Sequence, residues 1–186
     1  NGKVVGHCLF VGLFTSVAYN LSPRNIPLLR RRLQNIVDRA GYSRDSHDGK
    51  ALLNILETYP RDELFQVKED TLYKIATGIL YLQERQRVAL FVREDAFKRY
   101  LSCMVFVPRD RYDTVLRQKI QEILSSAVNG QSSAFFTQLG DSPLARVHLI
   151  IKLPERKIPK YDIATIEAKI TDAARSWGDK VLDALV

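Results

Sequence analysis

Residues 87–107, RVALFVREDAFKRYLSCMVFV, decide the fold class of this chain of 186 residues. Two runs in this stretch, 88–92 and 100–107, are rich in β-branched and aromatic residues, which favour strands. The polar residues 94–98 between them are typical of a short connection. The stretch therefore predicts two neighbouring β-strands.

The residues after this pair alternate between helical and strand-like patterns. Apolar residues recur at helical spacing over 114–128, and Gly130 suits the end of that helix. Two strand-like runs, 133–139 and 144–153, come next, and a last helix is predicted to start near Asp162. The apolar face of this last helix consists of Ile163, Ile166, Ile170, Trp177, Val181 and Leu185.

The predicted order over residues 87–186 is therefore ββαββα. This is the βαββαβ order of a ferredoxin-like sandwich, rotated by one strand. We expect an α+β domain in which four antiparallel strands carry the helices on one face.

Residues 1–86 have a different character. Residues 4–15 are rich in β-branched and aromatic residues and predict a β segment, which we interpret as the end of a preceding β module. Helices are predicted over 26–40, over about 48–59 and from near Asp70. The first 86 residues are thus expected to hold the end of a β module and a three-helix connector.

Several residues mark the ends of these helices. Pro27 fits a first turn, where its missing N–H costs nothing, and Gly41 fits the left-handed position that ends a helix. Ser46 or Asp48 can cap the second helix by accepting from a first-turn N–H, and Pro60 ends it.

The composition is that of an ordinary globular chain, with 46% hydrophobic and 26% charged residues. No apolar run approaches the ~20 residues that a membrane helix needs. Cys8 and Cys103 lie in apolar surroundings, so we interpret both as small core residues in a protein of the reducing cytoplasm. The chain starts without methionine and stops within a helical pattern, and we expect it to be part of a longer protein.

A search for catalytic or cofactor motifs is negative. The glycine spacing does not give G-x-G-x-x-G, and Gly49-Lys50 is no P-loop, because Arg44 stands at the required upstream glycine position and Ala51 replaces the hydroxyl residue. His7, His47 and His148 are far apart in the sequence, which disfavours a zinc site. No active site, bound cofactor or metal is therefore expected within these residues.

The first candidate site is the stretch of His47, Asp48 and Lys50, where the imidazole and carboxylate could form an acid–base pair. The simpler interpretation is a self-capped helix N-terminus, because an apolar helical run follows at once.

The second and third candidates are charged loops. Arg61 and Asp62 are most simply part of a charged turn that starts a new element. Arg109, Asp110 and Arg111 follow a predicted strand, and two arginines at a strand end can hold a carboxylate ligand through forked hydrogen bonds. Internal pairing within a loop is the alternative.

The net charge of +7 permits a polyanionic partner without requiring one. The only basic run is 30–32, which we interpret as a solvated or subunit-contact face. Residues 99–106 lack the glycines and spaced aromatic pair of an RNA-binding sheet, so binding of nucleic acid is disfavoured.

Three motifs carry a resemblance to a known family: SHDGKALL over 46–53, YPRDELFQ over 59–66 and VPRDRY over 107–112. Together they resemble the large bacterial type of NAD-dependent glutamate dehydrogenase, in the long non-catalytic region before its catalytic domain. Shorter matches at 13–16, 22–30 and 145–148 extend the resemblance over nearly the whole chain.

The resemblance implies a parent enzyme of amino-acid catabolism that oxidises L-glutamate to 2-oxoglutarate and ammonia with NAD, bound outside this segment. It also implies ACT-like and PAS-like modules in the N-terminal region, and the ββαββα half looks like an ACT module. We therefore expect a regulatory and oligomerisation segment that contacts other domains of its own chain and forms a homo-oligomer. A sensor that binds an amino acid near Arg109 and Arg111 is the alternative, and a nucleic-acid binder is the third.

Overall fold

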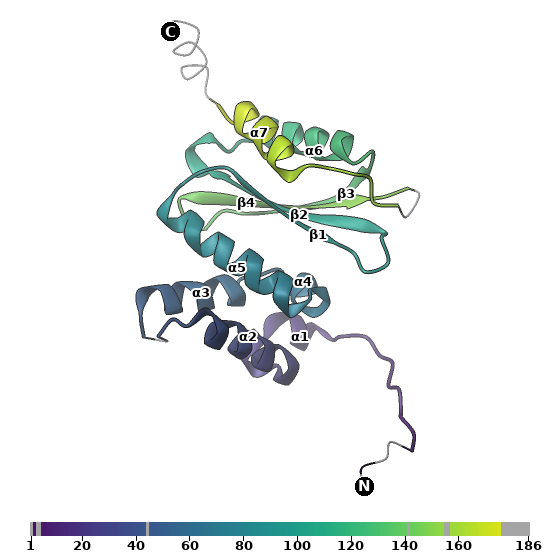
Figure 1. The fold of residues 1–186 in the computed structure, drawn as a ribbon. Coiled ribbons are helices and arrows are strands. Elements are labelled where there is room, and N and C mark those ends of the chain that lie inside the picture. Colours follow the sequence, from purple (N-terminus) through teal and green to yellow (C-terminus); the bar gives the residue numbers. More distant parts are fainter. Residues whose placement is uncertain (1, 3–4, 44, 141, 155–156, 176–186) are drawn as a thin grey trace, which may run out of the picture. The chain divides into compact units, whose positions relative to one another are not determined.

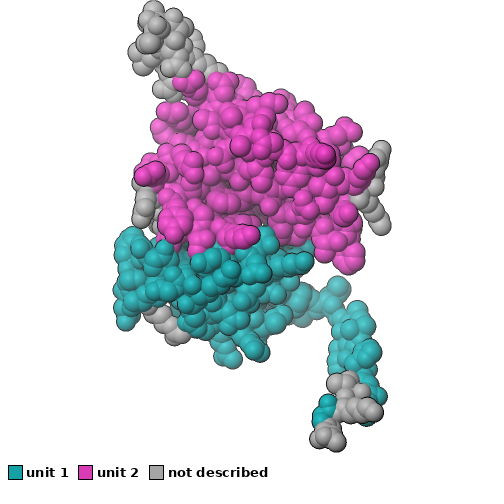
Figure 2. All heavy atoms as spheres, in the orientation of Figure 1, with its two compact units in different colours: residues 1–73 teal, residues 74–186 magenta. Residues whose placement is uncertain are grey.

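The structure is a computed structural model that describes residue 2 and residues 5–175, except 44, 141 and 155–156 (Figure 1). The chain divides into two compact units, residues 1–73 and 74–186 (Figure 2). The division falls inside one helix, and the domain boundary that the sequence suggests after residue 86 stays a prediction.

The first unit is helical. Its elements are α1 (Ser16–Asn20), the 3-10 turn η1 (Pro23–Asn25), α2 (Pro27–Ala40), α3 (His47–Glu57), α4 (Arg61–Gln66) and the first turns of α5 (Glu69–Glu84). Its buried side chains come from α2 to α5 and include Leu29, Leu33, Ile36, Leu52, Leu56, Leu64 and Leu72.

The predicted helix ends are confirmed. Pro27 is the first residue of α2, and Gly41 takes the left-handed conformation after it, with φ of 72°. Ser46 is the cap of α3, and its Oγ accepts from the Gly49 N–H at 3.1 Å. A Cβ at Gly49 would lie 2.1 Å from the Ser43 carbonyl oxygen, so this turn requires glycine.

Two predictions for this unit need correction. The β segment expected over 4–15 is wrong for residues 5–15, which form neither strand nor helix. A strand needs a partner for its backbone groups, and the described residues supply none there. Cys8, which was expected in the core, is exposed. The charged turn expected to start a new element at Arg61 is, by contrast, confirmed as the first turn of α4, which holds Asp62 and Glu63.

The second unit contains a four-stranded antiparallel sheet. Its strands are β1 (Ala89–Glu94), β2 (Tyr100–Pro108), β3 (Gln131–Gln138) and β4 (Leu144–Lys152), in the spatial order β1-β2-β4-β3. The helices α6 (Thr114–Ala127) and α7 (Ile163–Ala173) lie together on one face (Figure 1).

The topology confirms the ferredoxin-like prediction. β2 and β3 are both antiparallel to β4 and lie on either side of it, so they are parallel to each other and joined through α6. This is the split βαβ arrangement of that fold, and β1 adds to the free side of β2 through a short turn. The ββαββα order is therefore formed as predicted.

The sheet alternates between two faces. One face meets α6 and α7 through buried apolar residues such as Val105, Leu149 and Ile151. On α7 the expected apolar face is formed at Ile166 and Ile170, whereas Ile163 is exposed. Three further residues predicted for that face, Trp177, Val181 and Leu185, lie outside the described residues.

The opposite face carries Phe91 and Phe106, whose rings meet edge to face at 5.9 Å. A Cβ at Gly78 would lie 2.7 Å from the Phe91 ring, so α5 approaches this ring very closely at its glycine. Across the described ranges, no helix is long and apolar enough to cross a membrane.

Candidate functional site

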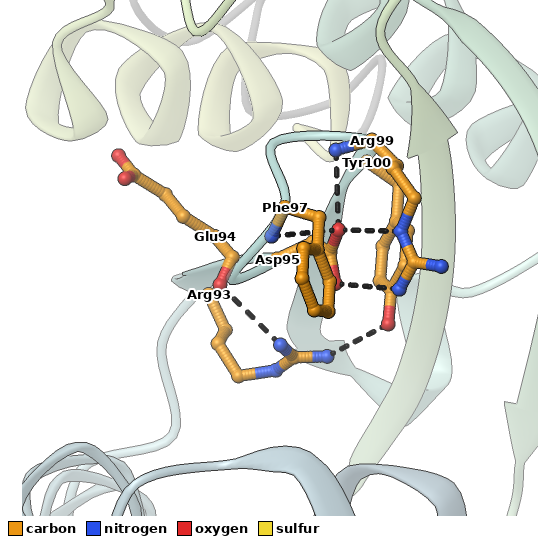
Figure 3. A network of polar contacts seen from close by, with 6 residues as sticks. All are labelled: Arg93, Glu94, Asp95, Phe97, Arg99 and Tyr100. Atoms are coloured by element: carbon orange, nitrogen blue, oxygen red, sulfur yellow. Dashed lines mark hydrogen bonds and ion pairs between the residues drawn. The ribbon is translucent and has the colours of Figure 1, made fainter. Parts of the chain in front are cut away.

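The most developed polar site is the turn that joins β1 to β2. Asp95 is only 4% exposed, and its carboxylate accepts from Arg99 through two bonds, from Nε at 2.8 Å and from Nη2 at 3.0 Å (Figure 3). Its Oδ2 also accepts from the backbone N–H groups of Phe97 and Arg99, both at 3.2 Å. The turn is thus organised around one buried carboxylate.

These bonds determine the charge state of the carboxylate. The hydrogen bond from Arg99, aided by the backbone donors and the nearby guanidinium charge, lowers the pKa of Asp95 from 3.8 to about 2, against the opposing effect of burial. The ion pair is therefore intact at neutral pH, and the same carboxylate raises the pKa of Arg99.

Tyr100 joins a second arginine to this turn. Arg93 is 8% exposed and donates from Nη2 to the Tyr100 hydroxyl and from Nη1 to the Glu94 carbonyl, both at 3.3 Å (Figure 3). The guanidinium carbons of Arg93 and Arg99 lie 5.6 and 5.7 Å from the centre of the Tyr100 ring. Beside Arg99 and Tyr100 a hollow of about 710 Å³ opens to solvent.

The sheet contains a second buried polar pair. Ser102 Oγ and His148 Nε2 lie 2.8 Å apart across β2 and β4, and both residues are less than a tenth exposed. The Phe136 ring lies 6.1 Å from the imidazole. A satisfied buried pair of this kind serves the sheet, because an unpaired imidazole would be costly there.

The first predicted site stays at the start of α3 as a surface feature. His47 Nδ1 lies 3.4 Å from Asp48 Oδ1, and the two side chains are 92% and 48% exposed. Ser46 makes the capping hydrogen bond, and Lys50 is exposed. No other predicted site residue joins this pair in the part of the chain that the structure describes.

The second predicted site anchors the N-terminal segment. Arg61 Nη2 donates to the Leu21 carbonyl at 2.8 Å, and the Tyr19 hydroxyl donates to Asp62 at 2.8 Å. This hydrogen bond raises the pKa of Tyr19. The Phe14 ring stacks on Phe65 at 4.0 Å. Arg61 and Asp62 therefore hold residues 14–21 against α4.

The third predicted site lies at the far end of β2, in the 3-10 turn η2 (Arg109–Arg111). Arg109 donates from Nη1 to the Gly140 carbonyl at 2.7 Å and from its backbone N–H to Pro143 at 2.9 Å. Arg109 thus pins the β3–β4 turn, while Asp110 and Arg111 are exposed. The sequence-based hypothesis of a carboxylate ligand at this turn stays a prediction.

Arg32 shows that a basic run can have a structural role. Its Nη1 donates to the Leu64 carbonyl at 2.6 Å and to the Val67 carbonyl at 3.1 Å, which satisfies the end of α4. Among the described residues, no group of three or more histidines, cysteines or acids could hold a metal ion.

The Asp95 and Arg99 site is not predicted by the sequence, because residues 94–98 indicate only a short connection. A usable signal was present, because an acid four residues before an arginine in a tight turn can pair with it. The buried partners of that pair depend on the sheet register and are not visible in the sequence.

Two family models match the chain. The model described as "Glutamate dehydrogenase, ACT2 domain" matches residues 89–178, which include the whole sheet. The model described as "Glutamate dehydrogenase, helical motif 1" matches residues 26–85, from just before α2 to just beyond α5. The chain therefore carries two modules of glutamate dehydrogenases, an ACT2 domain and the first helical motif.

Curated relatives narrow this class. Proteins named NAD-specific glutamate dehydrogenase are 47% identical over 185 residues in Halomonas elongata, 38% over 178 in Pseudomonas aeruginosa and 34% over 196 in Mycobacterium tuberculosis. These alignments cover 100%, 96% and 99% of this chain but only 12%, 11% and 12% of the relatives. The chain belongs to the NAD-specific glutamate dehydrogenase family, as the motif resemblance predicts.

Proposed function

We propose that this chain is a non-catalytic regulatory and oligomerisation segment of an NAD-dependent glutamate dehydrogenase. The parent enzyme oxidises L-glutamate to 2-oxoglutarate and ammonia and reduces NAD to NADH, in a domain outside these residues. The observation that carries the proposal is the ACT2 match over an intact four-stranded sheet, together with the names of the relatives. The missing dinucleotide loop in the sequence agrees with it.

The edge strand β3 supports a role in assembly. No residue of this strand is buried, and the rings of Phe135 and Phe136 are 47% and 63% exposed. An edge strand with large exposed apolar side chains is a surface on which a second chain or domain can pack. The partner we propose is another domain of the parent, in the same subunit or in a neighbouring one.

The experiment compares two charge insertions in the full-length parent enzyme. Phe136→Asp places a charge on β3, and Val115→Asp places the same charge on α6, at a residue that is 56% exposed. We expect Phe136→Asp to lower the oligomer mass in light scattering, or to alter the cooperativity of the glutamate response, while Val115→Asp matches the wild type. If both variants match the wild type in both measurements, the role in assembly is wrong.

A second assay tests the absence of catalysis. The isolated chain is mixed with L-glutamate and NAD, and absorbance at the NADH maximum is followed. We expect no glutamate-dependent increase, and turnover that survives repurification of the chain would refute the proposal.

A further inference from the structure

The hollow beside Arg99 lies at the end of the sheet where β2 begins and β4 ends. It is lined by Arg99, Tyr100, Asn129, Gln131 and Lys152 among others, and its volume is about 710 Å³. The candidate turn at Arg109 lies at the other end of β2, so the two places are distinct. Among the described residues, the lining contains two cations and no acid, and it therefore favours a negatively charged occupant.

Arg99 is held in one orientation at this hollow. Its Nε and Nη2 are occupied by the buried Asp95, whereas its side chain as a whole is half exposed. The remaining nitrogen, Nη1, points away from Asp95 (Figure 3) and has no hydrogen-bond partner among the described residues. A donor fixed in this way loses little conformational entropy when a ligand binds.

The loop between α6 and β3 supplies the opposite wall. A Cβ at Gly130 would lie 2.6 Å from Ile151 Cγ2 and 2.8 Å from the Lys152 carbonyl oxygen, so the loop touches the end of β4 at a glycine. Asn129 adopts a positive φ of 46° beside it. The amides of Asn129 and Gln131 therefore flank Lys152, and neither amide bonds to another side chain in the described ranges.

A smaller hollow of about 280 Å³ continues this surface. It shares Asn129 and Pro154 with the first hollow and adds Lys157, and the lining residues that the structure describes again include no acid. The two hollows thus form one trough, the Arg99 trough, with cations at Arg99, Lys152 and Lys157.

We propose that the Arg99 trough binds a small phosphorylated molecule. Asp95 already occupies the Nε and Nη2 side of Arg99, which is one of the two places where an arginine binds a carboxylate through paired hydrogen bonds. What remains is three N–H groups of Arg99, two ammonium groups and two amides, which are more donors than the two oxygens of one carboxylate can use and are spaced along the trough. Such point donors suit the several oxygens of a phosphate or pyrophosphate group.

The test is calorimetric titration of the 186-residue chain with pyrophosphate, ADP and succinate. We expect pyrophosphate and ADP to bind and succinate to bind at least tenfold more weakly. Raising the salt concentration should weaken the binding of both phosphorylated probes, because the contacts are partly exposed.

Charge-removing variants locate the site. Lys152→Gln and Lys157→Gln should each raise the Kd for pyrophosphate about tenfold, the usual scale for loss of one charge-assisted contact. Lys119→Gln removes an exposed lysine of α6 that does not line the trough and should leave the Kd unchanged. Circular dichroism of each variant verifies that the fold is kept.

Three results would overturn the proposal: no binding of pyrophosphate or ADP at millimolar concentration, equal loss in Lys119→Gln, or succinate binding as tightly as pyrophosphate. The proposal does not depend on the assembly role. Its test measures ligand binding to the isolated chain, whereas the assembly test measures the oligomer mass and the kinetics of the parent enzyme.

Discussion

The two edge strands of the sheet, β1 and β3, occupy equivalent positions and have opposite surroundings. In β1, the residues Ala89, Leu90 and Arg93 are buried, and the Leu90 N–H on its outer edge donates to Glu167 of α7 at 2.9 Å. In β3 every residue is at least partly exposed. Whether an edge strand is open to solvent therefore depends on the side chains that cover it, and not on its position at the edge of the sheet.

The contrast has a simple physical origin. The turn at Asp95 and the helices α5 and α7 approach β1, whereas β3 is covered in part by α6, whose Arg117 lies 4.2 Å from the centre of the Phe135 ring. A guanidinium over a ring shields one face of it and leaves the strand edge free. If the sheet extends by pairing, β3 is thus the edge that we expect to take part.

The largest expected effect compares one apolar residue from each edge. Leu90→Ala in β1 removes a side chain that is 4% exposed and should lower the free energy of unfolding by about 2–4 kcal/mol. Phe136→Ala in β3 removes a ring that is 63% exposed and should change it by less than about 0.5 kcal/mol. Urea unfolding of the chain, followed by circular dichroism, measures both.

Equal losses of unfolding free energy in the two variants would show that β1 and β3 do not differ in how well they are covered. A large loss at Phe136 alone would mean that β3 is buried in solution by association, and repeating the unfolding at several protein concentrations would reveal it.

The second prediction concerns the turn that follows β1. Asp95→Asn keeps the size of the side chain and removes its charge, so at pH 7 it should lower the free energy of unfolding by up to about 2 kcal/mol. The folded pKa of Asp95, about 2, lies below its ordinary value of 3.8. The contribution is therefore present above about pH 4 and is lost as the pH falls toward 2.

Unfolding measured at a series of pH values tests this sign. The wild type and Asp95→Asn should differ most above about pH 4 and converge near pH 2. A constant difference across that range would show that the charge of Asp95 contributes nothing. Asp110→Asn, at an exposed acid of η2, is the matched control and should follow the wild type.

The strands and the helix ends were predictable because each of them follows a local pattern in the sequence. The runs 88–92 and 100–107 are rich in β-branched and aromatic residues, and Gly41, Pro27 and Ser46 mark helix ends through their own chemistry. Residues 4–15 show where a local pattern alone gives the wrong prediction. Their composition favours a strand, but a strand forms only where another supplies the backbone partners, and 5–15 have none among the described residues.

The candidate site was less predictable for the same reason. Asp95 and Arg99 are close in sequence, yet the burial of Asp95 and the position of Lys152 beside Arg99 depend on the pairing of β2 with β4. Two of the predicted site residues, His47 and Arg109, lie at a helix start and in a turn. Charged residues in loops are conspicuous in a sequence whether or not they form a site.

The third prediction concerns the bond that closes the β1 edge. Glu167→Ala leaves the Leu90 N–H without its acceptor and should cost about 1–2 kcal/mol of unfolding free energy. Glu167→Gln keeps an acceptor oxygen and should cost less. Hydrogen exchange of the Leu90 amide reports this bond directly and should be faster in Glu167→Ala. Unchanged exchange there would mean that Glu167 does not close the edge.

The smallest expected effect is spectroscopic and concerns Tyr161. This residue lies just before α7, and its side chain contacts the end of β1. The Tyr161 hydroxyl donates to Glu94 at 3.2 Å, and burial, together with the Glu94 charge, raises the pKa of Tyr161 from 10.0 to about 12. Because the folded pKa is raised, its stabilising contribution is complete below pH 10 and is lost as the pH rises toward 12. In an ultraviolet titration of tyrosinate, Tyr161→Phe should therefore remove a late-ionising group. Loss of an early-ionising group from Tyr161→Phe would show that the end of β1 is open to water, and the difference between the two edges would then be confined to Leu90 and its neighbours.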